Sequence, residues 1–96
     1  MSRDHRWYFL TNHALVLIEA AQNPDSTVKA ISEGVGITER AVHRILAELI
    51  QEGYVIRRRL GRRNCYAVRG DSRFRHPKMT HLEVGRLFAA LGLDGS

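Results

Sequence analysis

The amino-acid sequence predicts a single, mainly α domain with one small β-hairpin, an α+β fold in the order helix, helix, helix, strand, strand, helix. Apolar residues recur at helical spacing in four segments, and between the third and fourth the spacing changes to the period of two that is typical of strands. Turn-forming residues separate the segments. The length of 96 residues fits one domain, residues 1–96, with one compact core.

The first helix is predicted to begin after Thr11, whose hydroxyl can cap it, and to end near Asn23, because Pro24 follows. Four apolar residues fall at positions i, i+3, i+4 and i+7, which is one face of a helix: Ala14, Leu17, Ile18 and Ala21. We expect this face to pack against the core.

A helix-turn-helix is predicted over residues 27–52. Thr27 can cap a short helix, which Gly34-Val35-Gly36 then ends, because glycine supplies the left-handed backbone of a tight turn. Thr38 can cap the following, longer helix. That helix has one continuous apolar face, made of Val42, Ile45, Leu46, Leu49 and Ile50.

A β-hairpin is predicted over residues 54–68, because apolar and basic residues alternate there. A three-residue loop at 61–63 would place Ile56 opposite Val68 on a half-buried face. The hairpin would then present its arginines to solvent.

Residues 69–78 are polar and basic, and we expect them to form an extended connector that ends at His76-Pro77. Thr80 can cap a last helix that runs to about Leu91, residues 80–91. The apolar stripe of this helix is Val84, Leu87, Phe88 and Leu91.

The positive charge is concentrated in one part of the chain. The net charge is +5, yet residues 53–76 contain eight arginines and one acid, a net of +7, which leaves −2 for the remainder. Such a local field attracts a polyanion, and double-stranded DNA is the predicted partner.

The outer face of the third helix has the residues expected of a helix that reads the major groove. Arg40 and Arg44 lie one turn apart, and arginine can bind guanine through two hydrogen bonds. Glu39 can accept from cytosine or merely complement the helix dipole. The predicted DNA contacts on this helix are Thr38, Glu39, Arg40, His43 and Arg44. The alternative is the solvated charged face of an ordinary three-helix bundle.

The hairpin favours DNA binding, because five arginines lie within seven residues around Gly61 and repel one another unless an anion is present. The predicted DNA contacts here are Arg57, Arg59, Arg62, Arg63 and Asn64. The alternative is a sheet edge that the charges merely keep soluble.

Three segments carry a resemblance: Gly36-Ile37-Thr38-Glu39-Arg40-Ala41-Val42-His43-Arg44-Ile45-Leu46-Ala47-Glu48-Leu49, Gly53-Tyr54-Val55 and Gly61-Arg62-Arg63-Asn64-Cys65-Tyr66. They resemble the helix-turn-helix and wing of bacterial winged-helix transcriptional regulators of the MarR/ArsR type. Phe9-Leu10-Thr11-Asn12-His13-Ala14 and Arg75-His76-Pro77 are similar to a set of short actinobacterial regulators. The resemblance covers about residues 7–91.

The resemblance implies a recognition helix at 38–52, a wing at 55–68 and a role in transcription control. Members with a known effector pocket usually have longer terminal helices than this chain. Ser32 stands where alanine is common in the family, and we expect that change to be harmless.

Other functions are less well supported by the residues. His76 and His81 are spaced around Pro77, and Cys65 has no second thiol near it, so no metal or other cofactor is predicted. A redox switch at Cys65 would require a lowered pKa of that thiol. His43 has no nearby nucleophile, and catalytic residues are not predicted. The remaining alternatives are RNA binding and a winged-helix adaptor that binds protein.

We expect a cytoplasmic homodimer. The longest apolar run, Ala14 to Ile18, is too short to span a membrane, and the single cysteine fits a reducing compartment. Two apolar segments exceed what one small core needs. The predicted dimerisation residues in them are Trp7, Phe9, Val84, Leu87, Phe88 and Leu91.

Overall fold

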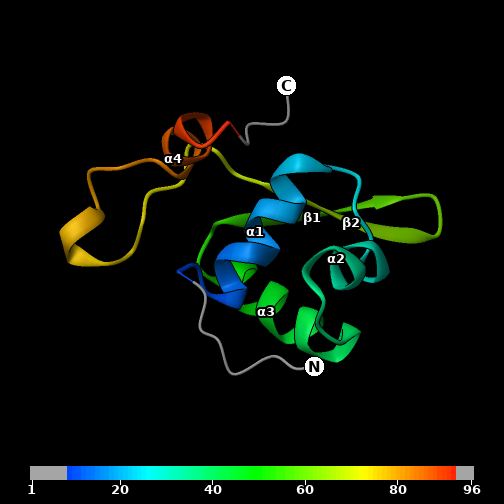
Figure 1. Cartoon of the computed structure of the whole chain (residues 1–96). Coiled ribbons are helices and arrows are strands. Elements are labelled where there is room, and N and C mark those ends of the chain that lie inside the picture. Colours follow the sequence, from blue (N-terminus) through cyan, green and yellow to red (C-terminus); the bar gives the residue numbers. More distant parts are fainter. Residues whose placement is uncertain (1–8, 93–96) are drawn as a thin grey trace.

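The computed structural model describes residues 9–92 (Figure 1). Its elements are α1 (Asn12–Gln22), α2 (Val28–Val35), α3 (Glu39–Gln51), β1 (Val55–Leu60), β2 (Arg63–Val68), the 3-10 helix η1 (Pro77–Met79) and α4 (Val84–Ala90). The predicted α+β fold and the order of its helices and strands are confirmed. No helix within the described residues combines the length and apolar character that crossing a bilayer requires.

Three threonines start the first three helices in the same way. The hydroxyl oxygens of Thr11, Thr27 and Thr38 each accept a hydrogen bond from the backbone N–H three residues later, at 3.2, 3.2 and 3.1 Å. Each bond satisfies an N–H group that would have no partner within its helix. The three predicted caps are confirmed.

In the tight turn between α2 and α3, Gly36 is the glycine with a positive φ. Gly36 has a φ of 86° and ends α2, whereas Gly34 and Val35 are still helical, so only Gly36 of the predicted stop Gly34-Val35-Gly36 ends the helix. Gly34 has a different role in the fold. The flexible end of the Glu19 side chain, from α1, occupies the space that a Cβ at Gly34 would fill.

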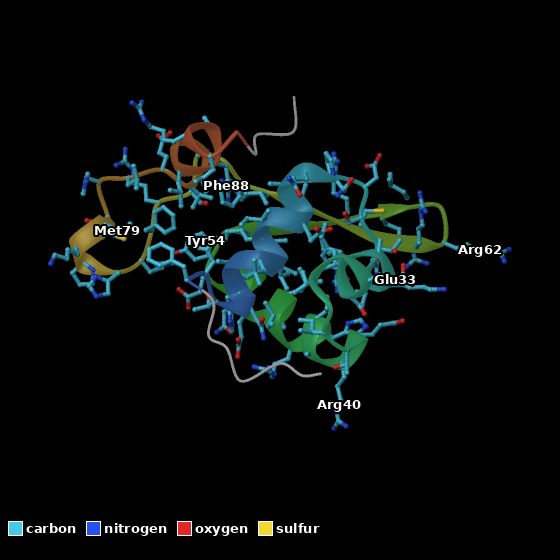
Figure 2. The ribbon with its side chains drawn as sticks, in the orientation of Figure 1. Glu33, Arg40, Tyr54, Arg62, Met79 and Phe88 are labelled. Atoms are coloured by element: carbon cyan, nitrogen blue, oxygen red, sulfur yellow. The ribbon has the colours of Figure 1, made fainter. Side chains whose placement is uncertain are left out.

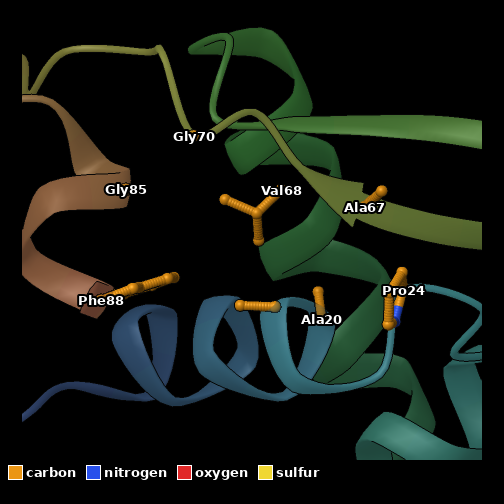
Figure 3. Close-up of a pocket in the computed structure, with 8 residues that line it drawn as sticks. Ala20, Pro24, Ala67, Val68, Gly70, Gly85 and Phe88 are labelled. Atoms are coloured by element: carbon orange, nitrogen blue, oxygen red, sulfur yellow. The ribbon is translucent and has the colours of Figure 1, made fainter. Parts of the chain in front are cut away.

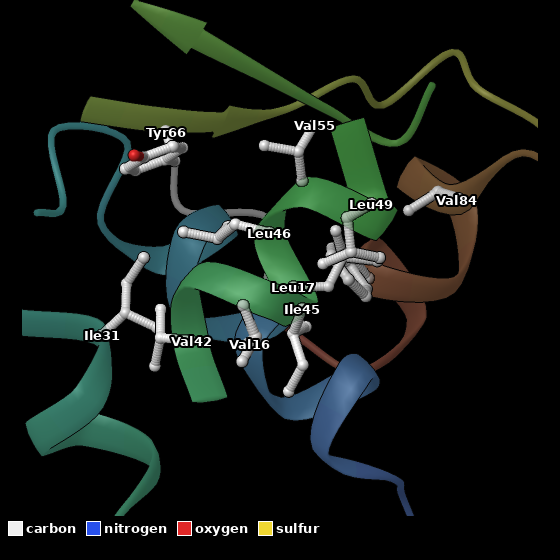
Figure 4. Packing of buried hydrophobic residues seen from close by; sticks show 11 residues of the cluster. Val16, Leu17, Ile31, Val42, Ile45, Leu46, Leu49, Val55, Tyr66 and Val84 are labelled. Atoms are coloured by element: carbon white, nitrogen blue, oxygen red, sulfur yellow. The ribbon is translucent and has the colours of Figure 1, made fainter. Parts of the chain in front are cut away.

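The core lies between the three helices, one face of the hairpin and α4 (Figure 4). Helix α1 contributes Val16 and Leu17, and α2 contributes Ile31. The other fully or nearly buried members are Val42, Ile45, Leu46, Leu49, Val55, Tyr66, Val84 and Phe88. Since α3 supplies four of these side chains, its inner face is fixed and its outer face is left to solvent.

The hairpin has a two-residue loop, so the predicted loop at 61–63 and its pairing of Ile56 with Val68 are wrong. Val55 pairs with Val68 and Leu60 with Arg63. Gly61, with a φ of 63°, supplies the positive φ that such a short loop needs. A one-residue change of register exchanges the two faces of a strand. Val55 is therefore the core residue, at 2% exposure, and Ile56 is 48% exposed.

Thr80 does not cap the last helix, which is shorter than the predicted 80–91. Pro77 begins η1 instead, and the N-cap position of α4 is Glu83. The backbone N–H of Val84 donates to Ser72 O at 2.8 Å, and that of Gly85 donates to Gly70 O at 2.9 Å. These bonds fold residues 71–83 into a projecting segment, called the arm below, in place of an extended connector.

Candidate nucleic-acid interface

Helix α3 presents the predicted recognition residues on its solvent side. Thr38, Glu39, Arg40, His43 and Arg44 are all exposed, as is Ala47 one turn further on. Arg40 projects from the first turn of α3, away from the body of the protein (Figure 2). The helical repeat places these side chains on one face because the opposite face carries the core residues.

The guanidinium groups of this face have no acidic partner in the described part of the chain. Residues 9–92 contain ion pairs between His13 and Glu48, between Arg69 and Asp71, and between Arg75 and Glu52, none of which involves Arg40 or Arg44. Glu39, in the first turn, lies near the positive end of the helix dipole. Both arginines are therefore available to an anionic or hydrogen-bonding ligand.

The wing, formed by β1, β2 and their loop, distributes its predicted contacts over two faces and a tip. Arg57, Arg59 and Asn64 share the face of Val55, since Arg59 pairs with Asn64 and alternate residues point the same way. Arg62 lies in the loop and extends beyond the hairpin (Figure 2). Arg63 lies on the other face, where it lines a surface cleft with Thr27.

All five predicted wing residues are exposed. Among residues 9–92, none of them forms an ion pair, and Arg59 Nε donates to the backbone oxygen of Gly61 at 3.2 Å. Like charges that lie so close together without acidic partners raise the local positive potential. The wing is thus the most strongly cationic projection of the fold.

Ser32 has a role in the helix-turn-helix that the sequence did not indicate. Its hydroxyl donates to the backbone oxygen of Ile37 at 2.7 Å, and its own carbonyl accepts from Gly36 and Ile37 at 2.8 and 3.2 Å. These bonds fix the turn that sets the direction of α3. Alanine, which is common at this position in the similar family, cannot make the hydroxyl bond.

Replacing Ser32 with alanine is expected to lower the free energy of unfolding by about 1 kcal/mol, because a partly buried hydrogen bond is lost. Urea denaturation followed by circular dichroism measures this difference. Ser72→Ala is the matched control, since the Ser72 hydroxyl donates to Arg69 O on the surface. A Ser32 variant as stable as the wild type would show that the turn does not depend on this bond.

Arg75 positions the other end of the recognition helix, although the sequence placed it in a connector. Its Nε and Nη2 donate to the backbone oxygen of Glu52 at 3.2 and 3.0 Å, and Nε lies 3.0 Å from Glu52 Oε1. Its backbone N–H donates to the Tyr54 hydroxyl at 2.7 Å. A cation at the carboxyl end of a helix is favourable. No local pattern predicts this contact, because the partners are 23 residues apart.

The predicted dimerisation residues are not one continuous surface. Val84 and Phe88 are buried in the subunit's own core, and Leu87 packs against that core, so these residues do not form the free stripe that the sequence suggested. Phe9 is 90% exposed and Leu91 is 50% exposed. Trp7 lies outside the described residues.

Three structural features concern the metal, redox and small-molecule alternatives. Among residues 9–92, no three His, Cys, Asp or Glu side chains come together as a metal site requires. Cys65 is fully buried. An apolar cavity of about 230 Å³ lies between α1, β2 and α4, next to Phe88 (Figure 3). Ligand sites usually have roughly 300–1,000 Å³, so we assign it no ligand.

Comparison with known families agrees with this geometry. Residues 12–56 match a family model described as winged helix-turn-helix DNA-binding. A search of curated proteins found no match to the chain. The matched span includes α1, α2 and all of α3, and it ends before the wing arginines. The chain therefore has the winged helix-turn-helix fold, and residues 12–56 are similar to a family described as DNA-binding.

Proposed function

We propose that the protein is a sequence-specific regulator of transcription that binds double-stranded DNA, with the outer face of α3 in the major groove. The observation that carries this proposal is the pair Arg40 and Arg44, exposed and without acidic partners in the described chain, on a helix whose opposite face is buried. Such a helix fits the major groove, which is about 12 Å wide. The family match supports DNA as the ligand.

The residues of α3 would divide the work of recognition. Arg40 and Arg44 would bind base edges, with guanine O6 and N7 as their preferred acceptors, and His43 lies beside them. Glu39 would accept from cytosine N4. The Thr38 hydroxyl accepts from the backbone N–H of Ala41. The earlier N–H groups at the start of α3 would remain able to donate to a phosphate.

The wing would hold the DNA backbone or the minor groove. Arg62 at the tip is the farthest-reaching cation of the hairpin in Figure 2. The remaining contacts of this kind are Arg57, Arg59, Arg63 and Asn64. Bonds to phosphates add affinity and orientation, and little sequence preference.

Selection of bound duplexes from a random pool by the purified full chain tests this function. We expect the recovered duplexes to share one sequence motif, and hydroxyl-radical cleavage to show protection centred on it. Recovery of duplexes without a common motif would contradict sequence-specific binding. Failure to retain any duplex at low salt would contradict DNA binding and favour a protein-binding adaptor.

The closer resemblance, to regulators of the MarR/ArsR type, supports two further proposals. The protein acts in the cytoplasm, and it binds as a homodimer held by its terminal segments. The exposed apolar side chains of Phe9 and Leu91 support the dimer, and Trp7 precedes the first of them in the chain. A symmetric dimer would read two half-sites about one helical turn apart.

We expect sedimentation equilibrium at tens of micromolar to give the mass of a dimer. Phe9→Ser is expected to shift the population toward monomer, because a 90% exposed phenylalanine contributes apolar surface only when a partner covers it. Met79→Ser is the control at another exposed apolar side chain. A wild-type monomer, unchanged by addition of the selected duplex, would contradict the dimer.

A further inference from the structure

The arm begins and ends at the same point of the fold. Gly85 N donates to Gly70 O at 2.9 Å, and a Cβ built on Gly85 would also lie 2.9 Å from that oxygen. The two glycines face each other at the root of the arm (Figure 3). Because the chain ends this excursion where it started, residues 71–83 are not needed to connect β2 with α4.

The arm has a defined conformation within the structure. Phe74 N donates to Leu82 O at 3.2 Å, and Arg73 and Glu83 form an antiparallel bridge. The Phe74 ring lies 6.2 Å from that of Tyr54, measured between centroids. Fixing a backbone costs conformational entropy, so an ordered loop that connectivity does not require points to a function.

The outer part of the arm, residues 73–82, carries three cations and no acid. Arg75 is engaged by Glu52. Arg73 and Lys78 are exposed and have no carboxylate at ion-pair distance within residues 9–92. His76 Nδ1 accepts from Lys78 N at 3.1 Å, so the neutral ring carries its proton on Nε2 as a further donor. His81 is also exposed.

The arm lies on the side of the protein opposite the wing. In Figure 1 the two project in opposite directions from the helical body, and α3 lies between them and below both. The long dimensions of the protein are 39 and 37 Å. A duplex with α3 in its major groove therefore extends toward the wing on one flank and toward the arm on the other.

We propose that the arm is a second contact to the DNA backbone, in which Arg73 and Lys78 bind phosphates on the flank opposite the wing. This inference rests on the proposed DNA binding by α3. Phosphate is favoured over an acidic protein surface because two unpaired cations and two imidazole groups match closely spaced anionic oxygens, and because the arm flanks the helix that would enter the groove.

The test combines arm variants with truncated DNA. Two duplexes carry the selected motif. The full duplex has about ten extra base pairs on each side, and the truncated duplex lacks the flank on the side of the arm. Footprinting of the bound protein identifies which flank that is. We expect Arg73→Ala/Lys78→Ala to bind the full duplex roughly tenfold more weakly than wild type at low salt, and to lower the slope of log K against log salt by about 0.9 for each phosphate that is no longer bound. On the truncated duplex the two proteins should bind equally.

Two further variants distinguish a lost phosphate contact from a disturbed arm and from a general loss of positive charge. Arg73 donates to Thr80 O at 3.4 Å, so its loss could loosen the arm as well as remove a charge. Lys78→Ala alone avoids this effect and should show about half of the change in slope. Lys29→Ala removes one positive charge from the exposed side of α2, which lies away from the arm in Figure 1, and should weaken both duplexes equally. Equal weakening of both duplexes by the arm variant, or no weakening of either, would overturn the proposal while specific binding remains. An unchanged DNA affinity with an altered oligomeric state would instead assign the arm to binding protein.

Discussion

Replacing Arg40 and Arg44 with alanine is expected to cost roughly 1–3 kcal/mol of specific DNA binding for each residue, the largest effect we expect of any surface change. The two side chains are exposed on the first half of α3 and have no acidic partner in the described chain, so the variants should fold as the wild type does. Affinity for random duplexes should fall much less. Competition titrations of the selected and random duplexes measure the ratio directly.

Arg40→Lys and Arg44→Lys are the matched controls. Lysine keeps the charge but cannot make the paired hydrogen bonds of a guanidinium, so these variants should retain random-duplex affinity and lose base preference. If the alanine variants weaken specific and random duplexes to the same extent, the two arginines bind phosphates and α3 does not read bases through them.

Removing the wing-tip arginines should lower the affinity for DNA without changing the sequence preference. Arg62→Ala and Arg63→Ala are expected to weaken all duplexes alike and to lower the slope of log K against log salt by about 0.9 for each phosphate that the variant fails to neutralise. Arg62 in the loop should contribute more than Arg63, because Arg63 lies on the face of the wing that adjoins the start of α2. Salt titrations on specific and random duplexes separate the two residues.

Arg86→Ala, on the exposed side of α4, is the control for loss of one positive charge. An unchanged slope in both wing variants would mean that the wing does not hold phosphates and that its arginines serve another ligand. A loss of specificity equal to that of the α3 variants would place the wing, rather than the helix, against base edges.

Local signals predicted the recognition face well. Capping by Thr27 and Thr38 depends on residues three positions apart, and the buried face of α3 depends on a repeat within one helix. Both signals are complete in a short stretch of sequence. The exposure of Arg40 and Arg44 therefore followed from the sequence, whereas their binding to DNA remains a prediction.

The predicted hairpin register was wrong because the loop residues permit two pairings. Gly61-Arg62-Arg63 can form a three-residue loop, or Arg63 can pair with Leu60 and leave a two-residue loop. Choosing between them requires knowledge of which face the core covers, and the helices provide that information. The core covers Val55, so the shorter loop is formed.

The arm was missed for a similar reason. Thr80 followed by an apolar stripe satisfies the local pattern of a helix start, but the backbone of Val84 is held by Ser72 and that of Gly85 by Gly70. These partners come from the other end of the excursion. The same long-range packing buries Val84 and Phe88, which a helical stripe alone cannot distinguish from a dimer surface.

The burial of Cys65 provides a chemical probe of wing motion. The thiol is fully buried in β2, on the face opposite Val55, so a maleimide can reach it only when the segments that cover this face move apart. Local opening of this kind has its own free energy, which is usually smaller than that of global unfolding. The rate of alkylation therefore reports how often this face of the wing becomes exposed, from a cysteine that the protein already carries.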